Sequence, residues 1–255
     1  MSEVLERRFA RMGARVSLPE RPWHGAPRID VAPGGFAIGF TGAGVEAEVE
    51  VVDVRPREHH LLLLVRSGEE KSKFLCGHDE RHWFVAAIPE RARGVTGVTT
   101  AKIALQPEAV QELVERVKPK DRFRRRNEAY VRQGEWFFVP ADLRPAPTDA
   151  QIRRNEPLSR GRGKAHVMQF AFRRGGEPVY TSRRYPAGIG AEEFASLSPV
   201  ERRGNWRQFL RDPEVYAKGS VRHPDHATVH LGAWHRVHMN TEQGARAMQH
   251  VVFLD

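Results

Sequence analysis

The sequence predicts an α+β fold, built mainly from antiparallel sheet with a few flanking helices. Residues 45–51 (VEAEVEV) alternate between small apolar side chains and glutamate, which is typical of an antiparallel strand with one buried face. Short apolar or alternating runs, bounded by Gly, Pro and polar residues, recur along much of the chain. Residues 105–117 (LQPEAVQELVERV) combine helical apolar spacing with a proline in the first turn and another beyond the end, which predicts a helix.

In chain order, the first half of the protein is predicted to form a helix, a loop and then sheet. Residues 1–16 carry apolar side chains near one helical stripe, so we expect a short amphipathic helix that docks or frays. Residues 18–35 contain four prolines and predict a loop. Residues 59–67 (HHLLLLVRS) are apolar on both faces and predict a central strand. Residues 72–76 and 82–88 predict a hairpin around a polar tip.

A polar, proline-containing stretch then marks a candidate domain boundary. We expect an N-terminal β-rich α+β domain with a basic helix over residues 1–140 and a C-terminal α+β domain with a His-rich β meander over residues 165–255. Residues 141–164 are poor in large apolar side chains and predict a linker or a long surface loop. The alternative is that both halves pack as one unit.

The C-terminal half is predicted to alternate strands with short helices. Its patterns indicate strands at residues 166–172 and 177–185, and one broken helix or two short ones at residues 191–210. A β meander is expected over residues 214–239, followed by a final helix over residues 241–249.

The bulk composition indicates a protein that folds in a reducing compartment. With 255 residues, 40% of them hydrophobic, the chain can bury a sizeable core. The single cysteine, Cys76, excludes an internal disulfide framework and a Cys-rich zinc module within one chain. The first residues lack the apolar stretch of a signal peptide, and no run approaches the length of a membrane span. We therefore expect a cytoplasmic protein with no membrane partner.

The formal charge is concentrated in one third of the chain. Residues 101–184 contain 19 Lys and Arg against 10 Asp and Glu, a net of +9, whereas the rest of the chain has 22 of each. Phosphate-rich partners favour clustered Lys and Arg because binding releases condensed counterions. A near-neutral body with one basic segment therefore indicates a surface for a polyanion.

Aromatic residues lie between the basic ones in residues 118–140 (KPKDRFRRRNEAYVRQGEWFFVP). If residues 121–132 continue as a helix, consecutive arginines point about 100° apart and surround it with charge. Because arginine forks bind phosphate and aromatic rings stack on bases, we expect a non-catalytic accessory protein that binds nucleic acid, with RNA slightly favoured over DNA. The candidate contact residues are Lys118, Lys120, Arg122, Arg124, Arg125, Arg126, Tyr130, Arg132, Arg153, Arg154, Arg160, Arg162, Lys164, Arg173, Arg174, Arg183 and Arg184.

The same basic face also fits a second kind of partner. A scaffold subunit could present it to an acidic protein, or the chain could belong to a larger ribonucleoprotein or nucleoprotein assembly. Charges at the rim of such an interface would set the association rate, and Trp or Tyr anchors would carry the affinity.

Histidines are concentrated near the C-terminus, where residues 221–250 hold six of the twelve. If residues 227–239 form a hairpin that turns at Gly232 and Ala233, His230 faces His235 and the two offer a pair of metal ligands. A third ligand would come from His223, Asp225 or the tip at residues 77–82. Otherwise these histidines are half-buried packing residues.

A more specific pattern lies in the same stretch. Asp225 with His226, then Asn240 and His250, fall near the spacing of HNH-type ββα-metal nucleases, which this segment resembles. The resemblance implies that His226 is the general base, that Asn240 holds its loop, and that Asp225, His226 and His250 bind a divalent metal. The segment departs from the family because it is predicted as a hairpin instead of an irregular loop. A metal-dependent nuclease is therefore the alternative function, whereas nucleic-acid binding needs no cofactor.

Overall fold

The structure is a computed structural model that describes residues 2–17, 28–39, 47–159, 164–244 and 251–252. The described strands form four sheets, in which nearly all neighbouring strands run antiparallel. This arrangement confirms the predicted α+β class with mainly antiparallel sheet. No described helix is long and apolar enough to cross a membrane.

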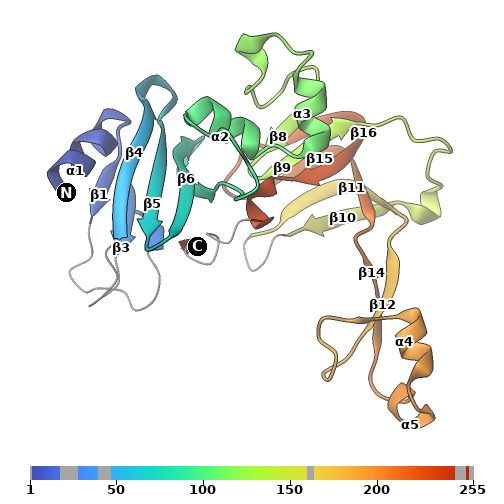
Figure 1. The fold of residues 1–255 in the computed structure, drawn as a ribbon. Coiled ribbons are helices and arrows are strands. Elements are labelled where there is room, and N and C mark those ends of the chain that lie inside the picture. Colours follow the sequence, from blue (N-terminus) through green and yellow to red (C-terminus); the bar gives the residue numbers. More distant parts are fainter. Residues whose placement is uncertain (1, 18–27, 40–46, 160–163, 245–250, 253–255) are drawn as a thin grey trace.

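Two four-stranded sheets pack face to face in the N-terminal half, with a helix beside them (Figure 1). Their orders are β1-β3-β2-β17 and β4-β5-β6-β7. The elements are α1 (Ser2–Arg11), β1 (Arg15–Ser17), β2 (Arg28–Ala32), β3 (Gly35–Gly39), β4 (Ala47–Arg55), β5 (His60–Ser67), β6 (Glu70–Asp79), β7 (His82–Ala87) and β17 (Val251–Val252).

The sequence patterns of α1 and of β5 to β7 predict their burial correctly, but residues 18–35, predicted as a loop, contain strand β2 with buried Ile29. Phe9 of α1 and Met12, which follows its last residue, are fully buried in the core between the sheets, so the amphipathic helix docks. Leu61 of β5 faces that core, while Leu62 faces the opposite side of the sheet, which confirms a central strand. Strands β6 and β7 form the predicted hairpin, closing where Asp79 pairs with His82.

Two short helices lie between the halves of the molecule (Figure 1). Helix α2 (Val98–Ala104) covers the outer face of the second sheet, and α3 (Glu108–Val114) lies within the predicted helix of residues 105–117. Val110 and Val114 of α3 pack against Phe137, an aromatic residue of the C-terminal half.

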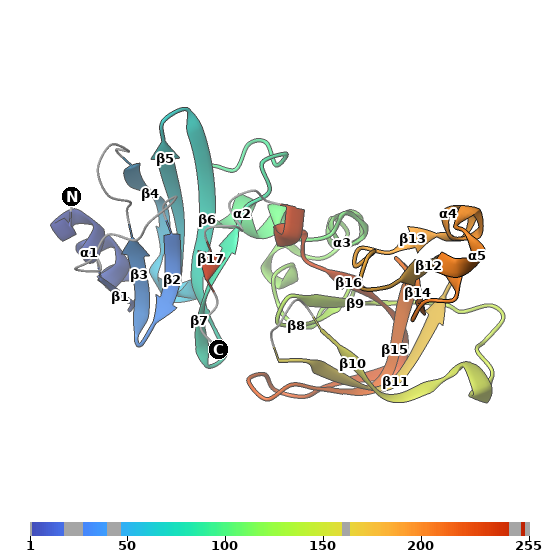
Figure 2. The ribbon, with the colours of Figure 1, turned by 90° about the horizontal axis from the view of Figure 1, so that it is seen from below.

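The C-terminal half is organised around one six-stranded sheet of order β10-β11-β15-β16-β9-β8 (Figure 2). Val131 and Leu158, from opposite edge strands, belong to one buried cluster, so the sheet curls around its inner face. Strands from both sides of residues 141–164 share this sheet, and one strand lies inside that range, so the stretch does not separate two sheets. The strands are β8 (Val131–Gln133), β9 (Trp136–Pro140), β10 (Arg153–Leu158), β11 (His166–Arg174), β15 (Glu214–Arg222) and β16 (Val229–Met239).

A small arm projects from the end of β11 and β15 (Figure 1). The predicted helical stretch of residues 191–210 contains two short helices, but its last residues form a strand. Aromatic contacts hold the arm together: Phe194 stacks on Tyr180 with centroids 4.0 Å apart and meets Trp206 edge to face at 5.0 Å. The arm consists of β12 (Glu177–Thr181), β13 (Ile189–Gly190), α4 (Ala191–Ser196), α5 (Pro199–Arg202) and β14 (Arg207–Arg211).

The predicted hairpin of residues 227–239 is wrong. These residues contribute to one long strand, β16, which pairs with β15 on one side and β9 on the other. The backbone at Gly232 stays outside the left-handed region that a two-residue turn requires. The β15–β16 register shifts between Leu231 and His235, so Gly232 and Ala233 lie in an irregular part of a continuous strand, which is paired with β15 on both sides of them.

The conditional helix of residues 121–132 does not form. A single 3₁₀ turn at Pro119–Asp121 gives way to turns and to β8. The side-chain oxygen of Asn127 accepts hydrogen bonds from the amides of Ala129 and Tyr130, at 2.9 and 3.1 Å. Such local bonds compete with the helical pattern and stop it here. Of the predicted final helix, Thr241–Gly244 forms a 3₁₀ turn, and residues 245–249 lie outside the described residues.

Candidate functional site

Three histidines converge at one end of the curled sheet. His166 is the first residue of β11, and its cross-strand partner Leu158 lies in the core of the inner face. His223 and His226 lie in the bend between β15 and β16. Because Val167 pairs with Arg222, the β11–β15 ladder brings His166 beside the start of that bend.

The three imidazoles offer nitrogen atoms that all lie within 4.8 Å of one another. The His166 ring stacks on His223 with centroids 4.2 Å apart, and the His223 and His226 centroids are 4.8 Å apart. His166 is only 2% exposed, and neither of its ring nitrogens has a hydrogen-bond partner among the described residues. A buried imidazole in this state is rare, because burial removes its hydration without replacement.

Two of these rings, His166 and His226, are held in their neutral form. Burial, reinforced by the neighbouring His223 and His226, lowers the pKa of His166 to about 3. Burial and His223 also lower the pKa of His226, against the opposing charges of Asp79 and Glu135. Near pH 7 these two imidazoles therefore carry lone pairs, which can accept hydrogen bonds or coordinate a metal.

Gly134, in the turn between β8 and β9, faces the cluster. A Cβ atom at this position would lie 2.9 Å from Nε2 of His226 and 3.4 Å from Nε2 of His166. The backbone φ of Gly134 is +57°, so glycine serves both the turn and the close approach. The two Nε2 atoms thus face a common space beside this glycine.

The tip of the β6–β7 hairpin reaches the same place from the N-terminal half. Oε2 of Glu80 lies 3.8 Å from Nδ1 of His226 and accepts a 2.7 Å hydrogen bond from the amide of Ala227. Arg125 forms ion pairs with both Asp79 and Glu80. A carboxylate behind a histidine is the usual outer partner in metal sites, because it orients the ring and its tautomer.

Asp79 in the same tip is held ionised by two arginines. Burial opposes its charge, but Arg132 at 3.3 Å and Arg125 outweigh that effect and lower its pKa. Predicted nucleic-acid contacts Arg125 and Arg132 are therefore engaged inside the protein, where they fasten the hairpin tip to the C-terminal half.

The nuclease-like set is only partly assembled. His226 lies in the cluster, but the Asp225 carboxylate is bound by Lys164 at 3.1 and 3.2 Å and lies 3.9 Å from Nε2 of His82. Burial opposes ionisation of Asp225, and Lys164 outweighs it to lower the pKa. Asp225 is thus engaged by a lysine instead of joining the histidines.

The other predicted members have different surroundings. Asn240 follows β16, and its backbone N–H donates a 2.9 Å hydrogen bond to the backbone carbonyl of Glu135. His250 lies outside the described residues. His230 and His235 do not face each other, because they occupy one strand and pair with Ser220 and Ala217 respectively. The predicted ligand pair is therefore wrong.

Several predicted nucleic-acid contacts have structural roles. Arg122 donates to the carbonyls of Val117 and Glu115, both at 2.9 Å, and Arg126 donates to a carbonyl of β16 at 2.7 Å. Tyr130 is only 2% exposed, so it cannot act as a base platform. Other predicted residues form surface ion pairs, which are Arg124–Asp121, Lys164–Asp225, Arg173–Glu156 and Arg184–Glu201.

Other predicted contacts are exposed, and one of them, Arg154, belongs to a row of three side chains across the sheet. Arg154 pairs with Phe170, which in turn pairs with Lys218, so these side chains lie across β10, β11 and β15. The Arg154 guanidinium lies 5.1 Å above the Phe170 ring. Arg160 and Arg162 lie outside the described residues. The remaining exposed predicted residues are Lys118, Lys120, Arg153, Arg174 and Arg183.

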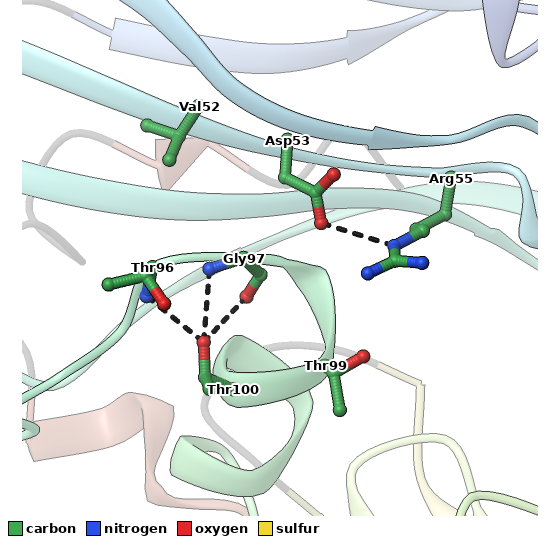
Figure 3. A pocket seen from close by; sticks show the side chains of 7 residues that line it. All are labelled: Val52, Asp53, Arg55, Thr96, Gly97, Thr99 and Thr100. Atoms are coloured by element: carbon green, nitrogen blue, oxygen red, sulfur yellow. Dashed lines mark hydrogen bonds and ion pairs between the residues drawn. The ribbon is translucent and has the colours of Figure 1, made fainter.

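Figure 3 shows a shallow pocket at the start of α2, whose lining includes neither the three histidines nor the residues of the row. Its polar groups satisfy each other. Asp53 accepts a 2.9 Å hydrogen bond from the amide of Val98, and Thr100 accepts from the amides of Thr96 and Gly97, both at 3.0 Å. These bonds cap the first turn of α2, so the pocket serves the fold.

The sequence patterns did not identify four residues of these candidate sites, which are His166, Gly134, Phe170 and Lys218. His166 opens an apolar run and resembles an ordinary strand residue, and no local signal marks Gly134 as a neighbour of histidines. His223 was foreseen only as one of several sources for a third ligand. No family model matches this chain, and neither curated proteins nor solved structures provide a match.

Proposed function

We propose that this protein binds single-stranded nucleic acid, with RNA slightly favoured over DNA, and acts as a non-catalytic accessory protein. The observation that carries the proposal is the row of Arg154, Phe170 and Lys218 on three adjacent strands. It places an aromatic ring between two cations on the surface of a sheet. Sheet-borne aromatics flanked by basic residues suit unstacked bases and their phosphates.

The chemistry of the row favours single strands over duplexes. A base can stack on the Phe170 ring or on the guanidinium of Arg154 only if it is free of its neighbours in a helix. Lys218 would then contact the adjoining phosphate as a point charge. Exposed Arg174 lies four residues after Phe170 on β11 and extends the positive surface, whereas Arg153 points to the opposite face of the sheet.

The proposed interface is narrower than the charge count alone suggests. The proposed interface leaves out four arginines whose side chains form hydrogen bonds or ion pairs within the protein, which are Arg122, Arg125, Arg126 and Arg132. The exposed cations of β10, β11 and β15 form the main contact.

Fluorescence anisotropy with labelled random-sequence RNA, DNA and duplex across a salt series tests the proposal. For a single strand, log K should fall with log salt by roughly 0.7 per phosphate neutralised. Lys218→Ala should flatten that slope by about 0.7, and Phe170→Ala should weaken binding by roughly 1 to 3 kcal/mol. Arg7→Ala, an exposed charge on α1, is the matched control and should change neither quantity.

Two results would contradict the proposal. One is the absence of binding at low salt by folded protein. The other is equal binding by the wild type and Phe170→Ala, with both folded as judged by circular dichroism. If a nuclease-resistant protein band co-purifies in stoichiometric amount instead, the scaffold alternative with an acidic partner gains the support.

A further inference from the structure

We propose that His166, His223 and His226 form a binding site for a divalent transition metal, with Zn²⁺ the ion that suits them best. The inference goes beyond nucleic-acid binding and does not depend on it. Its basis is the convergence of three imidazoles whose nitrogens lie within 4.8 Å of one another. Imidazole nitrogen is a preferred ligand of Zn²⁺, Cu²⁺ and Ni²⁺, whereas Mg²⁺ and Ca²⁺ favour oxygen.

The state of His166 is the second observation. This side chain is 98% buried and both of its ring nitrogens lack a hydrogen-bond partner among the described residues. A buried polar group without a partner destabilises the fold, so its presence calls for a role. Coordination of one nitrogen to a metal would supply the missing interaction.

The space for the ion lies beside Gly134. The Nε2 atoms of His226 and His166 both face the position that a Cβ on this glycine would fill, at 2.9 and 3.4 Å. Nitrogens bound to one tetrahedral Zn²⁺ at roughly 2.0 to 2.1 Å lie about 3.3 Å apart. The rings of His223 and His226 stack on His166 at 26° and 21°, so the rings must turn until their lone pairs point to one centre for the site to close around an ion.

Outer contacts already orient two of the rings. Glu80 lies 3.8 Å from Nδ1 of His226, which leaves Nε2 of that ring to face the ion. Nε2 of His223 lies 3.2 Å from the carbonyl of Lys164 and donates to it, so Nδ1 carries the lone pair. That Nδ1 accepts from the amide of Asp225 at 3.1 Å and would exchange this bond for the metal.

The ligand set also defines what completes the site. Three histidines leave one tetrahedral position unfilled by the protein, and the nearby Asp225 is engaged by Lys164. Sites with three protein ligands bind water or an anion at the fourth position. We therefore infer an open metal site instead of a closed structural one.

The test is zinc binding by the full chain, prepared without a polyhistidine tag and stripped with a chelator. Calorimetric titration should show one Zn²⁺ per chain, and Co²⁺ should give the visible absorption of tetrahedral coordination. His223→Ala and His226→Ala should each lower Zn²⁺ affinity by roughly 100-fold or more. Glu80→Gln should lower it by about 10- to 100-fold, as for other outer partners.

The matched control is His230→Ala, which removes an exposed histidine of β16 outside the cluster and should leave affinity unchanged. Circular dichroism identifies any variant that fails to fold, and His223→Asn, a smaller change at the same position, then replaces it. Binding of less than a tenth of an equivalent by the wild type would overturn the inference. So would wild-type affinity in folded variants at both His223 and His226, because the zinc would then sit elsewhere.

Discussion

Replacing Arg125 with methionine should destabilise the folded protein by about 2 kcal/mol. The arginine forms ion pairs with Asp79 and Glu80, and the three side chains are 37%, 19% and 17% exposed. Removing one partner costs roughly 3 to 5 kcal/mol at a fully buried pair and about 0 to 1 kcal/mol at an exposed one. The partial exposure, and the contact that Asp79 keeps with Arg132, place this site between the two limits.

Urea unfolding followed by tryptophan fluorescence measures the loss, and Arg124→Met is the matched control. Arg124 is the preceding residue, but its side chain is 68% exposed and pairs only with Asp121 at the surface. It should therefore change the free energy of unfolding by less than about 1 kcal/mol. A double-mutant cycle of Arg125→Met with Asp79→Asn should give a coupling of about 1 kcal/mol or more.

The pH dependence has a fixed sign. Because the folded state lowers the pKa of Asp79 from 3.8, its stabilising contribution is complete above that value and is lost as pH falls through the lower folded pKa. The advantage of the wild type over Arg125→Met should shrink in the same range. If Arg125→Met is as stable as Arg124→Met at neutral pH, the argument for a structural role of Arg125 fails.

Two further predictions concern half-buried His60 and buried Cys76 in the N-terminal sheets. Burial, with Lys102 adding to it, lowers the pKa of His60 from 6.5 to about 4. The stabilising contribution of neutral His60 is therefore complete above pH 6.5, and the free energy of unfolding should fall by up to about 3 kcal/mol as the pH drops from 6.5 through 4. In urea titrations between pH 7 and 4, His60→Gln should flatten this decline relative to wild type, and an unchanged slope would contradict the assignment. Cys76 is fully buried and burial raises its pKa, so a thiol reagent should label it only in denaturant. Rapid stoichiometric labelling of the folded protein would show instead that the thiol is accessible.

The sheet of β4 to β7 was predictable because its strands carry their environment in the local pattern, whereas β2 lies within residues 18–35, which were predicted as a loop. The alternation before β5, and the run of leucines within it, report one-sided and two-sided burial directly. Helix α1 is equally local, since an apolar stripe that includes Phe9 needs a surface to cover. None of these inferences required knowledge of a distant partner.

The error at residues 227–239 has the opposite cause. A Gly-Ala pair between two alternating runs suits a turn and an extended strand equally well, so the choice depends on neighbours. Here β15 pairs with β16 on both sides of Gly232, and β9, which is distant in sequence, pairs with its last five residues and favours the extended form. Long-range pairing of this kind leaves no mark in the local sequence.

The candidate metal site was missed for the same reason. His223 and His226 belong to the His-rich stretch near the C-terminus, but His166 lies beside them only because of the register between β11 and β15. The charge pattern predicted that Arg125 contacts nucleic acid, but Arg125 forms ion pairs with Asp79 and Glu80 in a hairpin that is distant in sequence. Composition located the basic segment, whereas the fold decided which of its charges face solvent.

The proposed zinc site and the proposed nucleic-acid surface involve different residues: Glu80 of the hairpin tip supports the first, and the row of Arg154, Phe170 and Lys218 forms the second. Glu80 contacts His226 and pairs with Arg125, so changing it should affect zinc affinity and the attachment of the hairpin together. Phe170 contacts neither group in the described structure and stacks under Arg154 on its own strands. A Phe170 variant that loses nucleic-acid binding while retaining zinc would therefore place the two properties on independent surfaces. Joint loss in that folded variant would instead indicate that the strands carry a coupling between them, since β11 contains both His166 and Phe170.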